Sequence, residues 1–228
     1  MKIILLRLRP SSNTVLPITH KHFLQSAIYS LLSKNLQYSS GLHEYDFSYD
    51  SHNFRLFTFN NLNKKRTAED RLVRLESDFE FEAQTLDKRF VNIMIESLHE
   101  SGGIQGYNIF CELINLYIFE RQIYRNNLRI GMLTPVTVYK TGENGKTIYF
   151  TPLDDEFINL INKNFCNKYL AAYGHMLGSG VFMHPELKGF PTHLKFLYYT
   201  GMVARNSQGL GVLKMFSQGK MRFFKEVL

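Results

Sequence analysis

The sequence predicts an α+β fold built from two halves in which strands and helices alternate. Along residues 1–126, apolar patterns follow one another in the order strand, helix, strand, strand, helix, strand. This βαββαβ order is that of the ferredoxin-like unit. A shorter, less regular series in residues 127–228 predicts an abbreviated second ferredoxin-like half in tandem with the first. Since no low-complexity linker separates the halves, we expect them to be docked rather than tethered.

The first half is expected to contain four strands and two helices. The strands are expected at residues 2–9, 54–59, 79–82 and 107–119. The run 107–119 is also compatible with a helix, but its aromatic and β-branched content favours a strand. The first helix carries one apolar stripe at helical spacing, made of Leu24, Ala27, Ile28, Leu31 and Leu32. Asp87 is placed to cap the second helix.

The second half is expected to begin with a strand over residues 129–139 and a turn at Gly142–Gly145. A helix follows over 154–172, with Asp154 or Asp155 as its cap. The remaining elements are a short strand near Val181, a helix over 191–199 and a last strand over 211–216.

The charge of the chain predicts a polyanionic partner. The 228 residues carry a formal net charge of +7, with a pI near 9.3. Seven basic residues lie between Lys188 and the C-terminus, where Glu226 is the only acid. A solvated face is the alternative explanation. Charge concentrated in this way favours a surface that binds phosphates.

Cysteine usage and the N-terminus indicate a cytoplasmic protein. Cys111 and Cys166 stand apart among apolar neighbours, which is typical of buried free thiols rather than of a zinc site. We therefore expect no metal and no cofactor. The apolar run at the N-terminus is too short for a signal peptide, and no run approaches the length of a membrane span.

A glycine-rich segment, Thr200–Gly211, is the most distinctive local feature. Glycines let the backbone take positive φ angles, so successive N–H groups could form an anion-binding nest. Arg205 adds a guanidinium fork that matches a phosphate. The alternative is a long turn that needs glycines only for its geometry. The segment is not a P-loop, because it lacks Gly-Lys-Ser/Thr and precedes a strand.

This segment resembles the C-terminal glycine-rich loop of the CRISPR-associated precursor-RNA endoribonucleases, the sixth CRISPR-associated family. The shared positions are Gly201, Asn206, Ser207, Gly209, Leu210 and Gly211. Val203 replaces the second glycine of the family pattern. Three further segments resemble the family in the same order: 16–29, 42–59 and 133–169. Only about 26 residues separate Gly174 from the loop, which predicts a shortened second sheet.

The resemblance implies cleavage of RNA by its own 2′-hydroxyl. That reaction needs a general base, a general acid and positive charge at the phosphorane. The chain has eight histidines, and their chemistry alone does not choose among them. The family pattern Leu-His-Glu selects His43 as catalytic, with His52 as the alternate. By the same resemblance Tyr29 and Arg55 complete the catalytic set, although Arg55 stands where lysine is usual.

The resemblance also implies that CRISPR repeat RNA is the partner, in its precursor and processed forms. The residues expected to bind it are Gly201, Arg205, Asn206, Ser207, Gly209, Gly211, Lys195, Lys214 and Arg222. A larger CRISPR effector complex is compatible with this assignment, and the sequence leaves a monomer and a homodimer open. Two alternatives stay open: a repeat-binding protein that does not cleave, and an unrelated basic RNA-binding protein. The second would be expected to show an aromatic RNP motif, which is absent.

Overall fold

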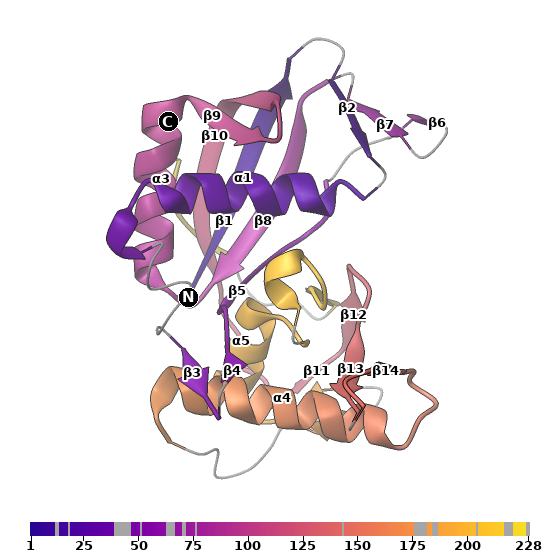
Figure 1. The fold of residues 1–228 in the computed structure, drawn as a ribbon. Helices are drawn as coiled ribbons and strands as arrows, with labels where there is room; N and C mark the ends of the chain where they lie inside the picture. The colour runs from indigo at the N-terminus through magenta and orange to yellow at the C-terminus, as the bar shows by residue number, and fades with distance from the viewer. Residues whose placement is uncertain are drawn as a thin grey trace.

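The structure is a computed structural model, and it has two parts that lie end to end (Figure 1). It describes residues 1–11, 14–17, 19–38, 47–50, 52–62, 67–69, 72–75, 77–142, 144–175, 182–183, 187–203, 205–216 and 221–226. The first part holds α1 (Lys21–Ser33) and α3 (Lys88–Ser101). The second part holds α4 (Glu156–Tyr173) and α5 (Pro191–Thr200). None of the described helices is long and apolar enough to cross a bilayer.

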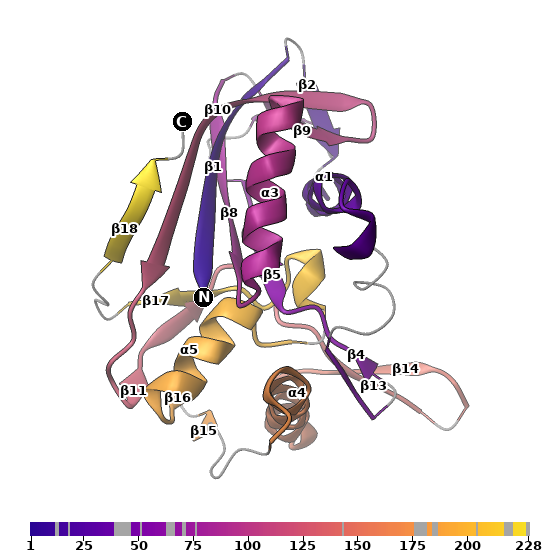
Figure 2. The ribbon, with the colours of Figure 1, turned by 90° about the vertical axis from the view of Figure 1, so that its left-hand side faces the viewer.

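A six-stranded antiparallel sheet forms the first part. Its strands lie in the order β18 (Met221–Glu226), β10 (Ile109–Arg121), β1 (Lys2–Pro10), β8 (Phe79–Thr85) and β5 (Phe57–Phe59), with β9 (Gly103–Gly106) also on β10. Within this sheet β1, β5, β8 and β10 follow the βαββαβ order, with the first strand between the third and the fourth. Helices α1 and α3 cover one face (Figure 2).

Strand β1 joins two hydrophobic cores. Ile4, Leu6 and Leu8 are fully buried in the core beneath α1 and α3. Ile3 points to the opposite face, as alternate residues of a strand must, and is buried in the core of the second part. The sheet is therefore covered on both faces near its lower end, where the two parts meet.

Most elements of the first half match their sequence predictions. The ambiguous run around residues 107–119 is a strand, β10. The Asp87 carboxylate caps α3 by accepting a hydrogen bond from the Arg89 N–H at 2.8 Å. The strand expected at 54–59 is shorter, because the chain before it forms the hairpin β3 (Ser48–Tyr49) and β4 (His52–Asn53). A small sheet of β2 (Thr14–Pro17), β7 (Leu72–Leu75) and β6 (Thr67–Glu69) was not predicted.

The second part consists of short ribbons around α4 and α5. They are β11 (Asn127–Leu128) with β16 (Leu187–Lys188) and β15 (Phe182–Met183), β12 (Ile130–Met132) with β17 (Leu213–Met215), and β13 (Val138–Thr141) with β14 (Thr147–Phe150). The single strand expected over 129–139 is therefore wrong. The Leu133 N–H still donates to the Val212 carbonyl at 2.9 Å, in register with the pairing of β12 and β17. The pairing ends there because the Val212 N–H donates to the Thr134 hydroxyl at 2.9 Å.

Two smaller predictions for the second half concern a turn and the cap of a helix. The turn at Gly142–Gly145 is present: the Gly145 N–H donates to the Gly142 carbonyl at 2.9 Å, and β13 and β14 pair on either side. Asp155 is the N-cap residue of α4, which is one of the two predicted alternatives, but its side chain makes no capping hydrogen bond. The Asp154 carboxylate accepts from the N–H and hydroxyl of Thr151, at 2.5 and 2.9 Å.

The chain returns to the first sheet at its C-terminal end. After β17, strand β18 pairs antiparallel with β10, with Phe119 opposite Phe223. Residues 221–226 thus extend the sheet of the first part, at its edge (Figure 2).

Candidate functional site

The glycine-rich segment lies where the two parts meet. It leaves α5, makes one 3-10 turn over Asn206–Gln208 and enters β17. This turn packs against β5 and against α1. Figure 1 shows it, in yellow, below α1 and beside β5. The segment therefore brings the C-terminal half to the helix that carries Tyr29 and to the strand that follows Arg55.

Asn206 fixes the segment to the chain that leads into β5. Its side chain is buried, and its Nδ2 donates to the Arg55 carbonyl and, at 2.6 Å, to the Phe57 carbonyl. A buried amide that satisfies two backbone acceptors at once holds both segments in register. The position of Arg55 is thus tied to the glycine-rich segment.

Two glycines of the segment have positive φ angles and no room for a side chain. A Cβ on Gly209 (φ +72°) would lie 2.7 Å from the Phe59 ring. A Cβ on Gly211 (φ +67°) would lie 2.7 Å from Cγ2 of Val203. Val203, which replaces a family glycine, is buried and fits because Gly211 opposite it has no side chain.

The segment's backbone is largely occupied by its own hydrogen bonds. The N–H groups of Met202, Gln208, Gly209 and Gly211 donate to carbonyls within the protein, at 2.9 to 3.0 Å. These four groups are therefore not free to form the anion-binding nest that the sequence suggested. A nest would therefore have to use other N–H groups of the segment.

Two lysines hold the segment from opposite sides, and neither was singled out from the sequence. Lys21 of α1 donates to the Gly209 carbonyl at 2.7 Å. Lys168 of α4 is 1% exposed and donates to the carbonyls of Gly201, at 3.2 Å, and Val203, at 2.6 Å. Burial lowers the pKa of Lys21 to about 8 and that of Lys168 to about 7.

Tyr29 and Arg55 come together beside this segment. The Arg55 guanidinium lies 5.5 Å from the centre of the Tyr29 ring, and the ring packs edge-on against Phe57 at 6.0 Å. The Tyr29 hydroxyl and Arg55 Nε are both buried, and neither has a well-formed hydrogen bond to the described residues. Buried polar atoms are rarely left in this state unless a ligand or water satisfies them.

The surroundings keep Tyr29 protonated. Burial raises the pKa of Tyr29, and the charge of Arg55 and the side chains of Ser207 and Gln25 only partly offset this effect. At neutral pH its hydroxyl is therefore a donor. Arg55 supplies a positive charge next to it.

Only one of the two candidate histidines lies within the described residues. His43 lies outside the described residues. His52 is exposed on β4, and its Nδ1 lies 2.6 Å from the Asp50 carbonyl. The His52 ring stacks on Phe54, with ring centres 6.4 Å apart, and its hairpin lies against α4 (Figure 1).

The expected phosphate contacts differ in their surroundings. Arg205 lies over the Tyr139 ring, 4.9 Å from its centre, and hydrogen bonding to Tyr139 raises the pKa of its guanidinium. Lys214 is exposed on β17. Lys195 is paired with Glu120, which argues against it as a phosphate contact. The backbone of Arg222 belongs to β18, and its side chain is not among those described.

The sequence predicted no metal site. Among the residues that the structure describes, no group of three or more His, Cys, Asp or Glu side chains gathers in a way that could hold a metal ion.

The fold and the glycine-rich segment define an α+β protein with one ferredoxin-like sheet and a docked C-terminal part. Comparisons with known proteins show which of them are similar to this chain. A sequence model described as "CRISPR associated protein Cas6, C-terminal" matches residues 118–182. The chain is 23% identical over 177 residues to "CRISPR-associated endoribonuclease Cas6 1" of Methanocaldococcus jannaschii. That match covers 74% of this chain and 65% of the relative, slightly under two thirds of its length.

Solved structures show the same fold. One described as "CRISPR associated protein Cas6" matches with a TM-score of 0.73 and 22% identity, over 95% of this chain and 99% of the other. Another, from a study of a Cas6-related gene from Pyrococcus furiosus, matches with a TM-score of 0.76 and 16% identity, over 96% and 99%. The comparisons agree on the CRISPR-associated Cas6 family, which confirms the resemblance carried by the sequence motifs.

Proposed function

We propose that this chain is an endoribonuclease that cleaves CRISPR precursor RNA within its repeats without a metal ion. The observation that carries the proposal is the pairing of Tyr29 with Arg55 beside the glycine-rich segment, each with a buried polar atom that lacks a well-formed hydrogen bond to the described residues. The similarity to a protein described as a CRISPR-associated endoribonuclease supports the same activity.

The proposed reaction begins with attack of a 2′-hydroxyl on the adjacent phosphorus. His43 acts as general base on that hydroxyl or as general acid at the leaving 5′-oxygen. Arg55 stabilises the charge of the phosphorane, since a guanidinium is too weak an acid to donate its proton. Tyr29, kept protonated by burial, donates a hydrogen bond to the reacting phosphate. The products are a 2′,3′-cyclic phosphate and a 5′-hydroxyl.

In this proposal the two halves of the chain have different roles. Residues 1–126 supply the catalytic residues, and residues 127–228, as an abbreviated second ferredoxin-like half, supply the glycine-rich segment. RNA would lie along this segment, with Arg205 and Lys214 at its phosphates. Asn206 and Ser207 would act from within the segment by holding Arg55 and Tyr29 in place.

Cleavage in the presence of EDTA tests the proposed function. Repeat RNA incubated with the protein and EDTA is expected to give discrete fragments on a denaturing gel. A gel shift without fragments would support a repeat-binding protein that does not cleave. If the protein does not prefer repeat RNA over unrelated RNA, the result would support a general RNA-binding protein.

Arg205→Ala is expected to weaken RNA binding and to lower the salt dependence of the association constant. Loss of one phosphate contact reduces the slope of log K against log salt by about one. Fluorescence anisotropy at several salt concentrations measures both quantities. Lys195→Ala serves as the comparison. This variant should change the slope little, because the charge of Lys195 is already paired with Glu120. If Arg205→Ala changes neither the affinity nor the slope, the glycine-rich segment is a structural turn and Arg205 does not contact a phosphate.

A further inference from the structure

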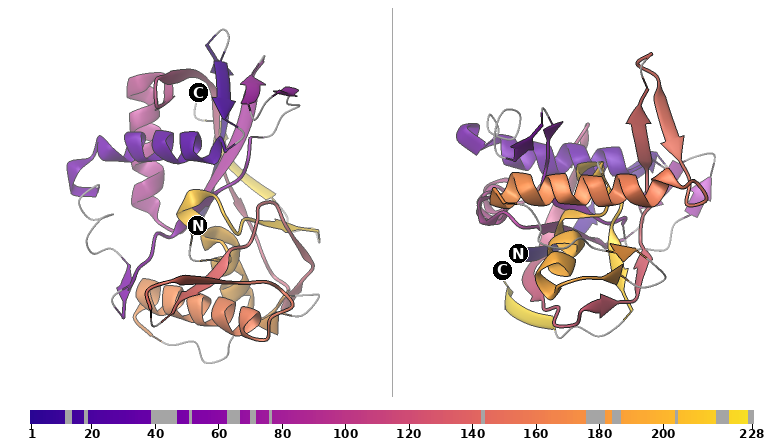
Figure 3. Two further views of the ribbon diagram at one scale, coloured as in Figure 1. Left: turned by 45° about the vertical axis from the view of Figure 1, so that its right-hand side comes forward. Right: turned by 90° about the horizontal axis from the view of Figure 1, so that it is seen from below.

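Lys21 joins the first helix to the turn of the glycine-rich segment, residues 206–209. This turn lies below the N-terminal half of α1 (Figure 1, Figure 3). Lys21, the first residue of α1, is half-buried there and donates from Nζ to the Gly209 carbonyl at 2.7 Å. Burial lowers the pKa of Lys21 to about 8, so at pH 7 the group is mainly an ammonium. The contact is therefore a charge-assisted hydrogen bond, which is stronger than one between neutral groups.

The turn links Gly209 to both members of the Tyr29–Arg55 pair. The Gly209 N–H donates to the Asn206 carbonyl at 2.9 Å, and the Asn206 side chain donates to the Arg55 carbonyl. Ser207 is the next residue of the turn. Burial raises the pKa of Tyr29, and the Ser207 side chain is close enough to the hydroxyl to oppose that rise. A displacement of Gly209 would therefore reach both side chains of the pair.

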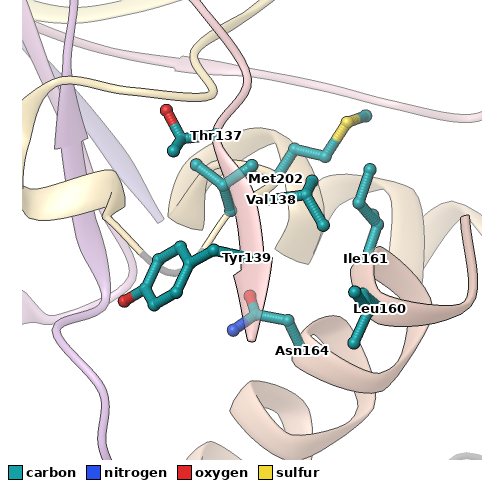
Figure 4. Close-up of a pocket in the computed structure, with 8 residues that line it drawn as sticks. Thr137, Val138, Tyr139, Leu160, Ile161, Asn164 and Met202 are labelled. Carbon is teal, nitrogen blue, oxygen red and sulfur yellow. The ribbon is translucent and has the colours of Figure 1, made fainter. Parts of the chain in front are cut away.

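The beginning of the segment is held in place without Lys21. There Lys168 donates to two backbone carbonyls from the side of α4. Met202 belongs to the same hydrophobic core as Val138 and Ile161, and Figure 4 shows these three side chains together between β13 and α4. Loss of the Lys21 contact should therefore loosen the turn and leave the start of the segment where it is.

We propose that Lys21 is a positioning residue of the cleavage site, which holds the turn against Tyr29 and Arg55 through the Gly209 carbonyl. The inference rests on the proposed function, since it gives Lys21 a part in that reaction. Lys21 acts on the reacting groups only through the turn. Its removal therefore lowers the rate constant of cleavage and changes the affinity for RNA little.

Single-turnover cleavage of repeat RNA, with affinity measured by anisotropy, tests this role. Lys21→Met is expected to lower the rate by about tenfold or more, since a misplacement of the order of 1 Å has effects of up to about a hundredfold. Lys21→Arg keeps a charged donor and should restore most of the rate. Lys34→Met is the matched control. Lys34 lies at the other end of α1 and also donates to a backbone carbonyl, that of Ser97 in α3, at 3.3 Å. Its loss should leave the rate unchanged.

Hydrogen exchange at pH 7 tests the tether without requiring cleavage. In Lys21→Met, peptides that cover residues 206–211 and 55–59 should exchange faster than in the parent protein, because the turn and the start of β5 are bonded to each other. Lys34→Met should leave both peptides as in the parent. Lys21→Gln, a milder change that keeps a neutral donor, should give an intermediate result in both experiments.

The outcomes separate this inference from the proposed function. A folded Lys21→Met or Lys21→Gln protein with the parent's exchange and the parent's rate overturns the positioning role. Equal losses of rate in Lys21→Met and Lys34→Met overturn it as well, because they would reflect general destabilisation. A loss of affinity at an unchanged rate would make Lys21 a phosphate contact instead. If exchange changes as expected but the parent does not cleave repeat RNA, Lys21 still holds the turn and the endoribonuclease assignment fails.

Discussion

His43→Ala is expected to lower the single-turnover rate of repeat-RNA cleavage by about a hundredfold or more. Histidine is the residue type of the proposed set best suited to exchange a proton near neutral pH, since burial raises the pKa of Tyr29. RNA affinity should hardly change, since one imidazole adds little to an interface dominated by phosphate contacts. Rapid mixing with excess enzyme measures the rate, and anisotropy measures the affinity.

His52→Ala is the matched comparison and should reduce the rate much less. His52 is exposed on its hairpin, with Nδ1 close to the Asp50 carbonyl. A reversal of the two effects would move the catalytic role to His52. Full activity in both variants would remove histidine from the mechanism. A 3′-hydroxyl product would contradict attack by the internal 2′-hydroxyl in any case.

Local patterns were enough to predict the core of the first part. The stripe from Leu24 to Leu32 and the Asp87 cap are encoded within one helix each, so periodicity and capping identify them. The break after Met132 and the pairing of β18 with β10 depend on contacts far along the chain. The expected strand over 129–139 failed for this reason, since its apolar content gives no sign that the Thr134 hydroxyl accepts the Val212 N–H.

The residues of the candidate site were likewise predicted only in part. Resemblance identified Tyr29 and Arg55, and the structure brings them together. An anion-binding nest cannot use the N–H groups of Met202, Gln208, Gly209 and Gly211, because these groups donate to carbonyls within the protein. Lys168 was missed because a lysine on a helix is usually solvated. A signal was nevertheless present, since Lys168 continues the buried stripe of Phe157, Ile161 and Phe165.

Lys168→Met is expected to destabilise the protein more at pH 9 than at pH 7. In the folded protein burial lowers the pKa of Lys168 to about 7, from 10.5 for an exposed lysine. Between these values the unfolded chain binds the proton and the folded chain does not, so stability rises with pH. The effect is of the order of 1 kcal/mol per pH unit. Methionine cannot titrate, so the variant lacks this gain.

Urea unfolding of both proteins at pH 7, 8 and 9 measures the difference, in which the contributions of other titrating groups largely cancel. Lys163→Met, on the exposed face of the same helix, is the control and should show a difference that does not change with pH. A constant penalty for Lys168→Met would mean that Lys168 keeps its proton in the folded protein. In that case its two carbonyl contacts, to Gly201 and Val203, are strong enough to offset burial of the charge, and Lys168 anchors the glycine-rich segment as an ammonium.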